Sequence, residues 1–223
     1  LHYHDYDLPS LEDLTEIVLI AHNEGRPVAS HCVTLSELML TLAAIEAAGP
    51  MEGDRIEHAA IASDEAIDWI ARMGVAVVTQ PGFIVDRLDA YEIDVDTREK
   101  PMLWRLASFL RKGVPLAAGS DAPFGSANPW RAMAAAVRRP AGFGDNETVS
   151  ADEALSLFLS PLSEPGGAAR RLCVGAPADI CLLSQPWTEA RADLSNVKVR
   201  ATLINGALAY SSTASTSPQD SAS

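Results

Sequence analysis

The chain has 223 residues, of which 48% are hydrophobic, and its 17 basic and 30 acidic side chains give a formal net charge of −13. Because phosphate backbones and anionic membrane surfaces attract basic proteins, this charge argues against a nucleic-acid partner and against a membrane partner. The length allows one large domain, or one and a half, around a sizeable core.

The cysteine content and the hydropathy pattern bear on the compartment. Three cysteines without a Cys-x-x-Cys spacing fit a reduced protein better than a disulfide framework. No stretch approaches the roughly 18 apolar residues of a membrane helix, and no signal peptide opens the sequence. We therefore expect a cytoplasmic protein. The sequence starts at Leu1 rather than Met, so we also expect further sequence upstream.

Helix-capping residues mark six predicted helices in the first 160 residues. Ser10 precedes an amphipathic run that starts at Leu11 and is stopped by Gly25, and Asp13 stands three residues after the cap. A capping residue or a proline at the start, in most cases with a glycine at the end, predicts the other helices at 35–48, 64–73, 102–112, 130–139 and 151–159.

Four apolar stretches alternate with these helices, and each ends in polar residues. They lead to His31, His58, Gln80 and Asp121. The alternation predicts a parallel sheet with right-handed crossovers. Active sites of parallel α/β proteins form at the carboxyl ends of the strands, so we expect these side chains to lie together. Two imidazoles and a carboxylate at one place suggest a metal site.

The sequence changes character after residue 172. Asn205-Gly206 is typical of a type I′ hairpin between two strands. With a third stretch upstream, the pattern predicts a small antiparallel sheet from strands at 180–183, 197–203 and 207–210. Residues 211–223 show no periodicity and predict a disordered tail.

Three motifs together resemble a known family. They are Asp54-Arg55-Ile56-Glu57-His58-Ala59, the stretch from Gly113 through Gly119-Ser120-Asp121 to Phe124, and Gly175-Ala176-Pro177-Ala178-Asp179-Ile180. In this order they resemble the amidohydrolase superfamily, specifically its amidohydrolase 3 (YtcJ-like) branch. The resemblance implies the C-terminal half of a distorted (β/α)8 TIM-type barrel, with strands 5 to 8 within residues 1–172. Residues 173–210 would then be the C-terminal part of a small β-sandwich.

The resemblance also implies roles for the polar strand ends. His31 is similar to the family's metal ligand on strand 5, His58 to the ligand on strand 6 and Asp121 to the acid on strand 8. A divalent metal is expected, with Zn²⁺ best suited to neutral imidazoles. Asp121 would act as general base and then as general acid, and Gln80 would contact the substrate.

Two histidines near the start of the chain remain open. His2-Tyr3-His4 imitates the metal-binding His-x-His pair that the family carries on strand 1, but the fifth-strand histidine follows within 30 residues. This places the motif at the end of strand 4 instead. Two interpretations of His2 and His4 therefore have about equal weight: they are part of a frayed terminus, or they contribute to the site.

The expected function is metal-dependent hydrolysis of a carbon–nitrogen bond in a small amide-like substrate. The alternative is a non-catalytic half barrel that acts as an interaction module or a remnant. Its exposed strand edges predict either a homo-oligomer or a missing N-terminal half, and the activity of the isolated chain is in doubt.

Three further groups have structural interpretations. His22 suits the C-terminal dipole of the first helix. Trp104 is expected to be a packing residue. The acidic residues from Asp86 to Asp96 are expected to form a solvated loop, and the alternative is a lid above the mouth of the barrel.

Overall fold

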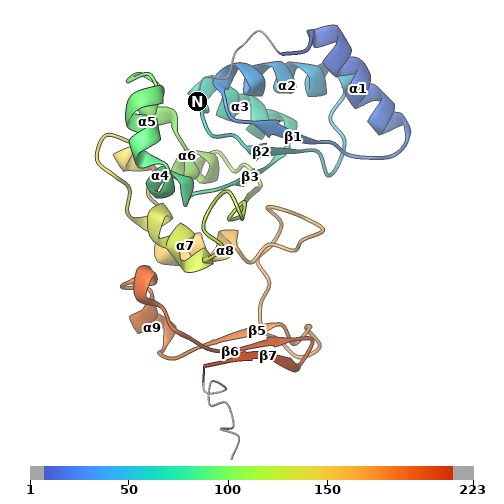
Figure 1. Cartoon of the computed structure of the whole chain (residues 1–223). Coiled ribbons are helices and arrows are strands. Elements are labelled where there is room, and N and C mark those ends of the chain that lie inside the picture. Colours follow the sequence, from blue (N-terminus) through green and yellow to red (C-terminus); the bar gives the residue numbers. More distant parts are fainter. Residues whose placement is uncertain (1–7, 213–223) are drawn as a thin grey trace, which may run out of the picture. The chain divides into compact units, whose positions relative to one another are not determined.

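A computed structural model describes residues 8–212 of the chain (Figure 1). The chain divides into two compact units between Arg170 and Arg171. The elements of the first unit are α1 (Leu11–Asn23), β1 (Ala29–Cys32), α2 (Leu35–Ala48), β2 (Arg55–His58), α3 (Asp64–Met73), β3 (Ala76–Thr79), α4 (Phe83–Asp86), α5 (Leu88–Asp94), η2 (Lys100–Met102), α6 (Leu106–Arg111), β4 (Leu116–Ala118), α7 (Pro129–Val137), η3 (Asp145–Glu147) and α8 (Ala151–Leu157). No helix within residues 8–212 is both long enough and apolar enough to cross a membrane.

The first unit contains a four-stranded parallel sheet in the order β1-β2-β3-β4. The predicted parallel sheet with strands in chain order is therefore confirmed. In Figure 1, α2 and α3 lie beside β1 and β2, and α2 contacts both β1 and α3. The sheet side chains that face these helices include Cys32, Ile56 and Val77, each of which is fully buried. The core therefore lies between the sheet and its crossover helices.

The predicted caps position the crossover helices. The Ser10 hydroxyl accepts a hydrogen bond from the Asp13 backbone N–H, and Ser63 caps α3 in the same way. Thr34 and Glu37 form a reciprocal capping box, and so do Ser150 and Glu153. Each box satisfies two backbone donors that would otherwise lack partners.

The helix predicted at 102–112 is shorter than expected, and the acidic segment is helical rather than a loop, although its acidic residues are exposed to solvent as expected. Leu103 pairs with Ile61 in a β-bridge, and Trp104 has a positive φ of 51°, so α6 starts only at Leu106. The acidic segment folds into α4 and α5, because Tyr91 inserts into the core and is only 2% exposed. In both segments, tertiary contacts outweigh the local pattern.

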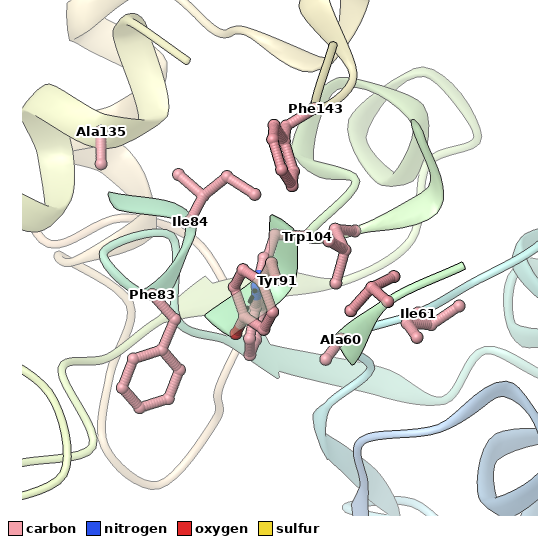
Figure 2. Close-up of a cluster of buried hydrophobic side chains, with 10 residues drawn as sticks. Ala60, Ile61, Phe83, Ile84, Tyr91, Trp104, Ala135 and Phe143 are labelled. Atoms are coloured by element: carbon pink, nitrogen blue, oxygen red, sulfur yellow. Dashed lines mark hydrogen bonds between the residues drawn. The ribbon is translucent and has the colours of Figure 1, made fainter. Parts of the chain in front are cut away.

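An aromatic cluster fills the space between α4, α5 and the segment before α6 (Figure 2). The Trp104 indole N–H donates to the Tyr91 hydroxyl at 3.2 Å, and the Phe83 ring centroid lies 5.5 Å from that of Trp104. Burial raises the pKa of Tyr91 to about 12. Trp104 is only 2% exposed, so the expected packing role is confirmed.

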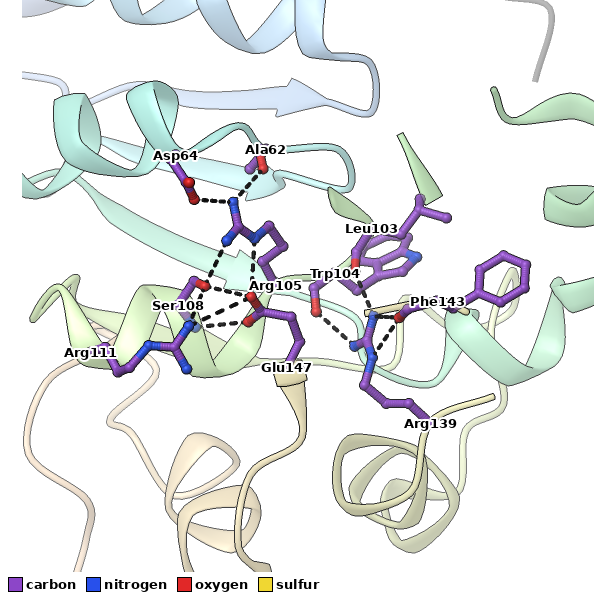
Figure 3. Close-up of polar contacts among 10 residues, drawn as sticks. All are labelled: Ala62, Asp64, Leu103, Trp104, Arg105, Ser108, Arg111, Arg139, Phe143 and Glu147. Atoms are coloured by element: carbon purple, nitrogen blue, oxygen red, sulfur yellow. Dashed lines mark hydrogen bonds and ion pairs between the residues drawn. The ribbon is translucent and has the colours of Figure 1, made fainter. Parts of the chain in front are cut away.

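Two buried polar networks support the same region (Figure 3). The fully buried Glu147 accepts hydrogen bonds from Arg105 Nε and from the Ser108 backbone N–H, at 3.1 and 2.8 Å. Arg139 donates to the carbonyl oxygens of Leu103, Trp104 and Phe143, and burial lowers the pKa of Arg139 to about 10. These contacts fix the backbone on both sides of the Trp104 indole.

At the opposite end of the sheet, His22 makes a specific side-chain contact. Its Nε2 lies 3.0 Å from Oδ1 of Asp54, a carboxylate that also accepts from the backbone N–H groups of Val28 and Met51. The side chains of His22 and Asp54 are 8% and 0% exposed. The interpretation of His22 as a residue that suits the helix dipole therefore missed its buried contact with Asp54, which connects α1 to the starts of β1 and β2.

The second unit carries a three-stranded sheet in the order β5-β6-β7, with antiparallel pairing as predicted. Its elements are β5 (Ile180–Leu183), α9 (Trp187–Ala190), η4 (Leu194–Asn196), β6 (Val199–Ile204) and β7 (Ala207–Ser211). Asn205 and Gly206 both have positive φ, as a type I′ turn requires. Ser211 still pairs with Ala201, so the strand continues one residue into the segment assigned to the tail.

Candidate active site

Two histidines meet at the carboxyl ends of β1 and β2. The ring centroids of His31 and His58 are 4.4 Å apart, with an angle of 70° between the ring planes. His31 is exposed, whereas His58 is 7% exposed and lies 6.4 Å, centroid to centroid, from Trp104. Burial and the neighbouring His31 lower the pKa of His58, which favours its neutral form. A neutral imidazole is the form that binds a metal.

The backbone of His58 accounts for this meeting. The strand register pairs His31 with Glu57, and paired residues of parallel strands point to the same face. Regular alternation would therefore turn His58 toward the helices with Ile56. Instead, His58 has a φ of 72°, which ends the alternation and lets its ring contact His31. Glu57 forms an ion pair with Arg55, at 2.6 Å from its Nε.

Gln80 fixes the orientation of His58. Its Oε1 lies 2.7 Å from His58 Nδ1, and its Nε2 donates to the Val78 carbonyl oxygen at 3.3 Å. Because an amide oxygen only accepts, Nδ1 of His58 carries the proton and Nε2 keeps a lone pair. Gln80 is 4% exposed, so the structure places it behind the histidine. The contact of Gln80 with the substrate, which the sequence analysis expects, stays a prediction.

Asp121 stands on a tight loop after β4. Its φ is 52°, and its carbonyl oxygen accepts from the backbone N–H groups of Phe124 and Gly125. A Cβ atom at Gly125 would overlap the Ser120 carbonyl oxygen, so only glycine fits this turn. The loop thereby holds Asp121 in a conformation that few non-glycine residues adopt.

A cavity of about 390 Å³ brings these groups together. His31, His58 and Asp121 all line it, as the strand-end argument predicted, and Gln80 does not. Three of its lining residues, His58, Trp104 and Asp121, are non-glycine residues with positive φ. Such conformations cost about 1–3 kcal/mol each and cluster at functional sites. Six further residues line the cavity, namely Val33, Phe83, Arg87, Tyr91, Trp104 and Phe124.

The donor chemistry fits a divalent metal in part. His31 and His58 are adjacent, and the hydrogen bond to Gln80 presents a free nitrogen of His58, as metal-binding histidines require. Within residues 8–212, however, no three His, Cys, Asp or Glu side chains converge closely enough to hold an ion. Asp121 lines the same cavity but does not complete a group of three metal-binding side chains with His31 and His58. His2 and His4 lie outside the described residues.

The geometry agrees with the relatives of the chain. The profile of the amidohydrolase family matches residues 3–210. The chain belongs to the amidohydrolase family. The resemblance inferred from the motifs is thereby confirmed. Members of one family share a fold more reliably than a substrate, so the reaction still has to be argued from the site.

Two curated proteins are similar over much of this amidohydrolase chain. "Putative amidohydrolase YtcJ" of Bacillus subtilis is 27% identical over 89% of the chain and 40% of its own length. The N-substituted formamide deformylase of Arthrobacter pascens is 28% identical over 72% of the chain and 31% of its own length. The chain therefore spans well under half the length of either relative.

Solved structures show the same fold. A metal-dependent hydrolase of Pyrococcus furiosus superposes with a TM-score of 0.60 at 30% identity, over 68% of this chain and 31% of its own. The E241Q variant of the atrazine chlorohydrolase TrzN of Arthrobacter aurescens, complexed with zinc and atraton, superposes with a TM-score of 0.57 at 16% identity, over 90% of this chain and 47% of its own. The α/β class with a parallel sheet thus agrees with the known hydrolase folds.

Proposed function

We propose that the chain carries part of the active site of a metal-dependent hydrolase acting on carbon–nitrogen bonds of the amide type. The observation that carries the proposal is the edge-to-face pair of His31 and His58, with the tautomer of His58 set by Gln80. A histidine that only packs in the core does not need a free ring nitrogen next to a second imidazole. A histidine that binds a metal needs such a free nitrogen, and its other ring nitrogen then donates a hydrogen bond to a fixed acceptor.

His31, His58 and Asp121 would hold the metal, with Zn²⁺ as the ion that best suits two neutral imidazoles. A bound divalent metal supplies Lewis acidity toward a carbonyl oxygen and toward water. Asp121, on its fixed loop, would accept the proton of the attacking water and pass it to the leaving nitrogen. Gln80 would keep His58 in one orientation throughout this cycle.

The substrate we propose is a small amide-like molecule. The deformylase of Arthrobacter pascens acts, by its name, on N-substituted formamides. Formamides are the smallest carbonyl compounds of the amide class. They are therefore the first compounds to test.

The fold proposal follows from the same comparison. We propose that the parallel sheet β1-β2-β3-β4 corresponds to strands 5 to 8 of a (β/α)8 barrel, and that residues 173–210 are part of a small β-sandwich; the strand order supports this proposal. Since the chain spans 40% and 31% of its curated relatives, we propose that the whole protein completes the site with further residues. A reducing, cytoplasmic location agrees with the free thiols of Cys32, Cys173 and Cys181.

Zinc binding tests the site directly. The purified chain should bind Zn²⁺ in a calorimetric titration, and His58→Ala should weaken that binding by at least about tenfold because one ligand is lost. Cys173→Ser, which removes an exposed thiol, is the matched control and should leave the affinity unchanged. Equal affinities of the chain and His58→Ala would overturn the metal site.

Formate release tests the reaction. N-Benzylformamide is offered with Zn²⁺ to the longest in-frame protein that contains this chain. We expect formate and benzylamine in equal amounts. Zinc binding without hydrolysis of this or other simple N-acyl amines would contradict the carbon–nitrogen bond class while leaving the metal site intact.

A further inference from the structure

Arg139 binds the backbone of a distant segment through its guanidinium group (Figure 3). It stands just after α7, and its Nε and Nη2 donate to the Phe143 carbonyl oxygen at 2.9 and 2.6 Å. Its Nη1 donates to the Trp104 carbonyl oxygen at 2.9 Å, and Nη2 also donates to that of Leu103 at 2.6 Å. These two residues lie 35 and 36 positions earlier in the chain. Arg139 therefore does more than close its own loop.

The hydrogen bonds of Arg139 come from a charged donor in a partly buried position. Burial lowers the pKa of Arg139 to about 10, so the guanidinium keeps its charge at neutral pH. Hydrogen bonds from a charged donor are about twice as strong as those between neutral groups. The planar guanidinium also fixes the direction of each bond. The carbonyl groups of Leu103 and Trp104 are therefore held in one orientation.

The positive φ of Trp104 brings these two carbonyl groups to one guanidinium. Successive carbonyl groups of an extended strand point to opposite sides. Trp104 has a φ of 51°, and its carbonyl oxygen and that of Leu103 both accept from Arg139. Such a φ is unusual for a large side chain, so contacts from other segments have to hold it. Arg139 supplies these contacts on the carbonyl side.

The segment that Arg139 holds is paired with the residues directly after His58. The backbone N–H of Trp104 donates to the Ala60 carbonyl oxygen at 2.7 Å. His58 and Ala59, which precede this contact, have φ values of 72° and 46°. Two consecutive non-glycine residues in this conformation need support from their surroundings. The hydrogen bond between Trp104 and Ala60 gives that support.

The Trp104 side chain also contacts the His58 ring. The two ring centroids are 6.4 Å apart, with 73° between the ring planes, so the edge of one ring faces the other. The indole is itself fixed by its hydrogen bond to the Tyr91 hydroxyl and by the Phe83 ring. The imidazole of His58 is thus held by the indole as well as by Gln80.

We propose that Arg139 is a positioning residue for His58. The guanidinium fixes the bent backbone at Trp104, and this backbone sets both the indole against the His58 ring and the hydrogen bond to the segment after His58. The consequence for metal binding rests on the proposed function, whereas the position of the imidazole does not. A metal ligand has to present its free nitrogen in one direction, so a rotated His58 ring should bind more weakly.

Nuclear magnetic resonance of the metal-free chain tests the positioning. The wild-type chain should show a nuclear Overhauser effect between the rings of Trp104 and His58, and Trp104→Phe identifies the indole signals among those of the four tryptophans. Arg139→Met removes every donor and should abolish this effect. It should also speed hydrogen exchange of the Trp104 indole N–H by at least about tenfold. Arg138→Met makes the same change at the exposed neighbouring arginine and should leave both readouts unchanged.

A calorimetric titration with Zn²⁺ measures the consequence for the candidate site. Arg139→Met should weaken zinc binding by about 3- to 30-fold, the range for a residue that acts on a site through other residues. His22→Leu is the control for lost stability, because it removes a buried contact at the opposite end of the sheet. It should leave the zinc affinity unchanged. Equal losses in the two variants would reveal a general effect of stability and would overturn the positioning role.

Circular dichroism checks that each variant is folded. Arg139→Lys keeps the charge but not the planar fork, so it replaces Arg139→Met, with the same expected changes, if the latter does not fold. Failure of both variants to fold would overturn the proposal, because Arg139 would then serve overall stability alone. So would a wild-type chain without the Overhauser effect, or a folded variant that keeps it.

The two measurements separate this inference from the proposed function. A wild-type chain that binds no zinc would overturn the proposed metal site, and the Overhauser effect would still decide the role of Arg139. In a chain that binds zinc, an affinity that is the same in the wild type and in the Arg139 variant would overturn the positioning role and leave the metal site in place.

Discussion

Replacement of Glu147 by glutamine should be among the most destabilising conservative changes in the first unit. Glu147 is fully buried, and its carboxylate accepts from Arg105 Nε, from the Ser108 backbone N–H and from the Ser108 hydroxyl (Figure 3). Glutamine has nearly the same shape, but it has no charge and one of its two oxygens becomes a donor. That donor would face groups that themselves donate.

The magnitude follows from these contacts. At least one of the three hydrogen bonds is lost, and the others lose their charged acceptor; a hydrogen bond to a charged group is worth about 1.5–3 kcal/mol. Arg105, which is 12% exposed, would keep only the exposed Asp64 as an acidic partner. We therefore expect Glu147→Gln to lower the free energy of unfolding by about 3–5 kcal/mol, the range for removing one partner of a buried ion pair.

Urea denaturation followed by circular dichroism measures this change. Glu16→Gln, on the exposed face of α1, is the control and should alter the free energy of unfolding by no more than about 0.5 kcal/mol. The double variant Glu147→Leu with Arg105→Met should recover much of the loss, since apolar pairs can replace buried ion pairs. A loss below about 1 kcal/mol for Glu147→Gln would refute the assignment of Glu147 as a buried hydrogen-bonded charge.

Four more outcomes can be measured. Gln80→Leu should weaken Zn²⁺ binding about 10- to 100-fold by calorimetry, because His58 loses the acceptor that fixes its tautomer; an unchanged affinity would exclude this role. Asp121→Asn in the longest in-frame protein should lower kcat by roughly 10² to 10⁴ at matched fold and largely retained metal content, and an undiminished kcat would remove Asp121 from the mechanism. The hydrogen bond from the Ser150 hydroxyl lowers the pKa of Glu153, so the wild-type chain should have a higher urea midpoint than Glu153→Gln at pH 7. This difference in midpoint should disappear as the pH falls below 4.5, the ordinary pKa of a glutamate. A difference that does not change with pH would refute the capping box of Ser150 and Glu153. The isolated chain should form dimers or larger species in analytical ultracentrifugation because of its two sheet edges, and a cooperative monomer would contradict this.

Much of the fold could be predicted from local sequence patterns. The caps at Ser10, Thr34, Ser63 and Ser150 mark helix starts because each hydroxyl satisfies a donor a few residues away. The four strand positions and their parallel order follow from the apolar stretches between these helices. Such features depend on residues that are close together in the sequence, so they can be predicted without the tertiary structure.

Part of the candidate site could also be predicted, since strand ends of a parallel sheet share one edge. His31, His58 and Asp121 line one cavity for this reason. Gln80 comes to the same edge, but only the structure shows that it bonds to His58. The strand alternation could not show that a positive φ at His58 turns its ring toward His31.

What only the tertiary structure decided are the contacts between segments distant in the chain. Trp104 interrupts a helical pattern because Arg139, 35 residues later, binds its carbonyl oxygen, while Tyr91 accepts from its indole N–H. Arg87 is one charged residue among many in the sequence, and only the structure shows that its guanidinium lies over the Phe83 ring and donates to the Phe124 carbonyl oxygen. Local sequence patterns show which backbone groups will be hydrogen-bonded in helices and strands. The burial and pairing of side chains depend instead on how the whole unit packs.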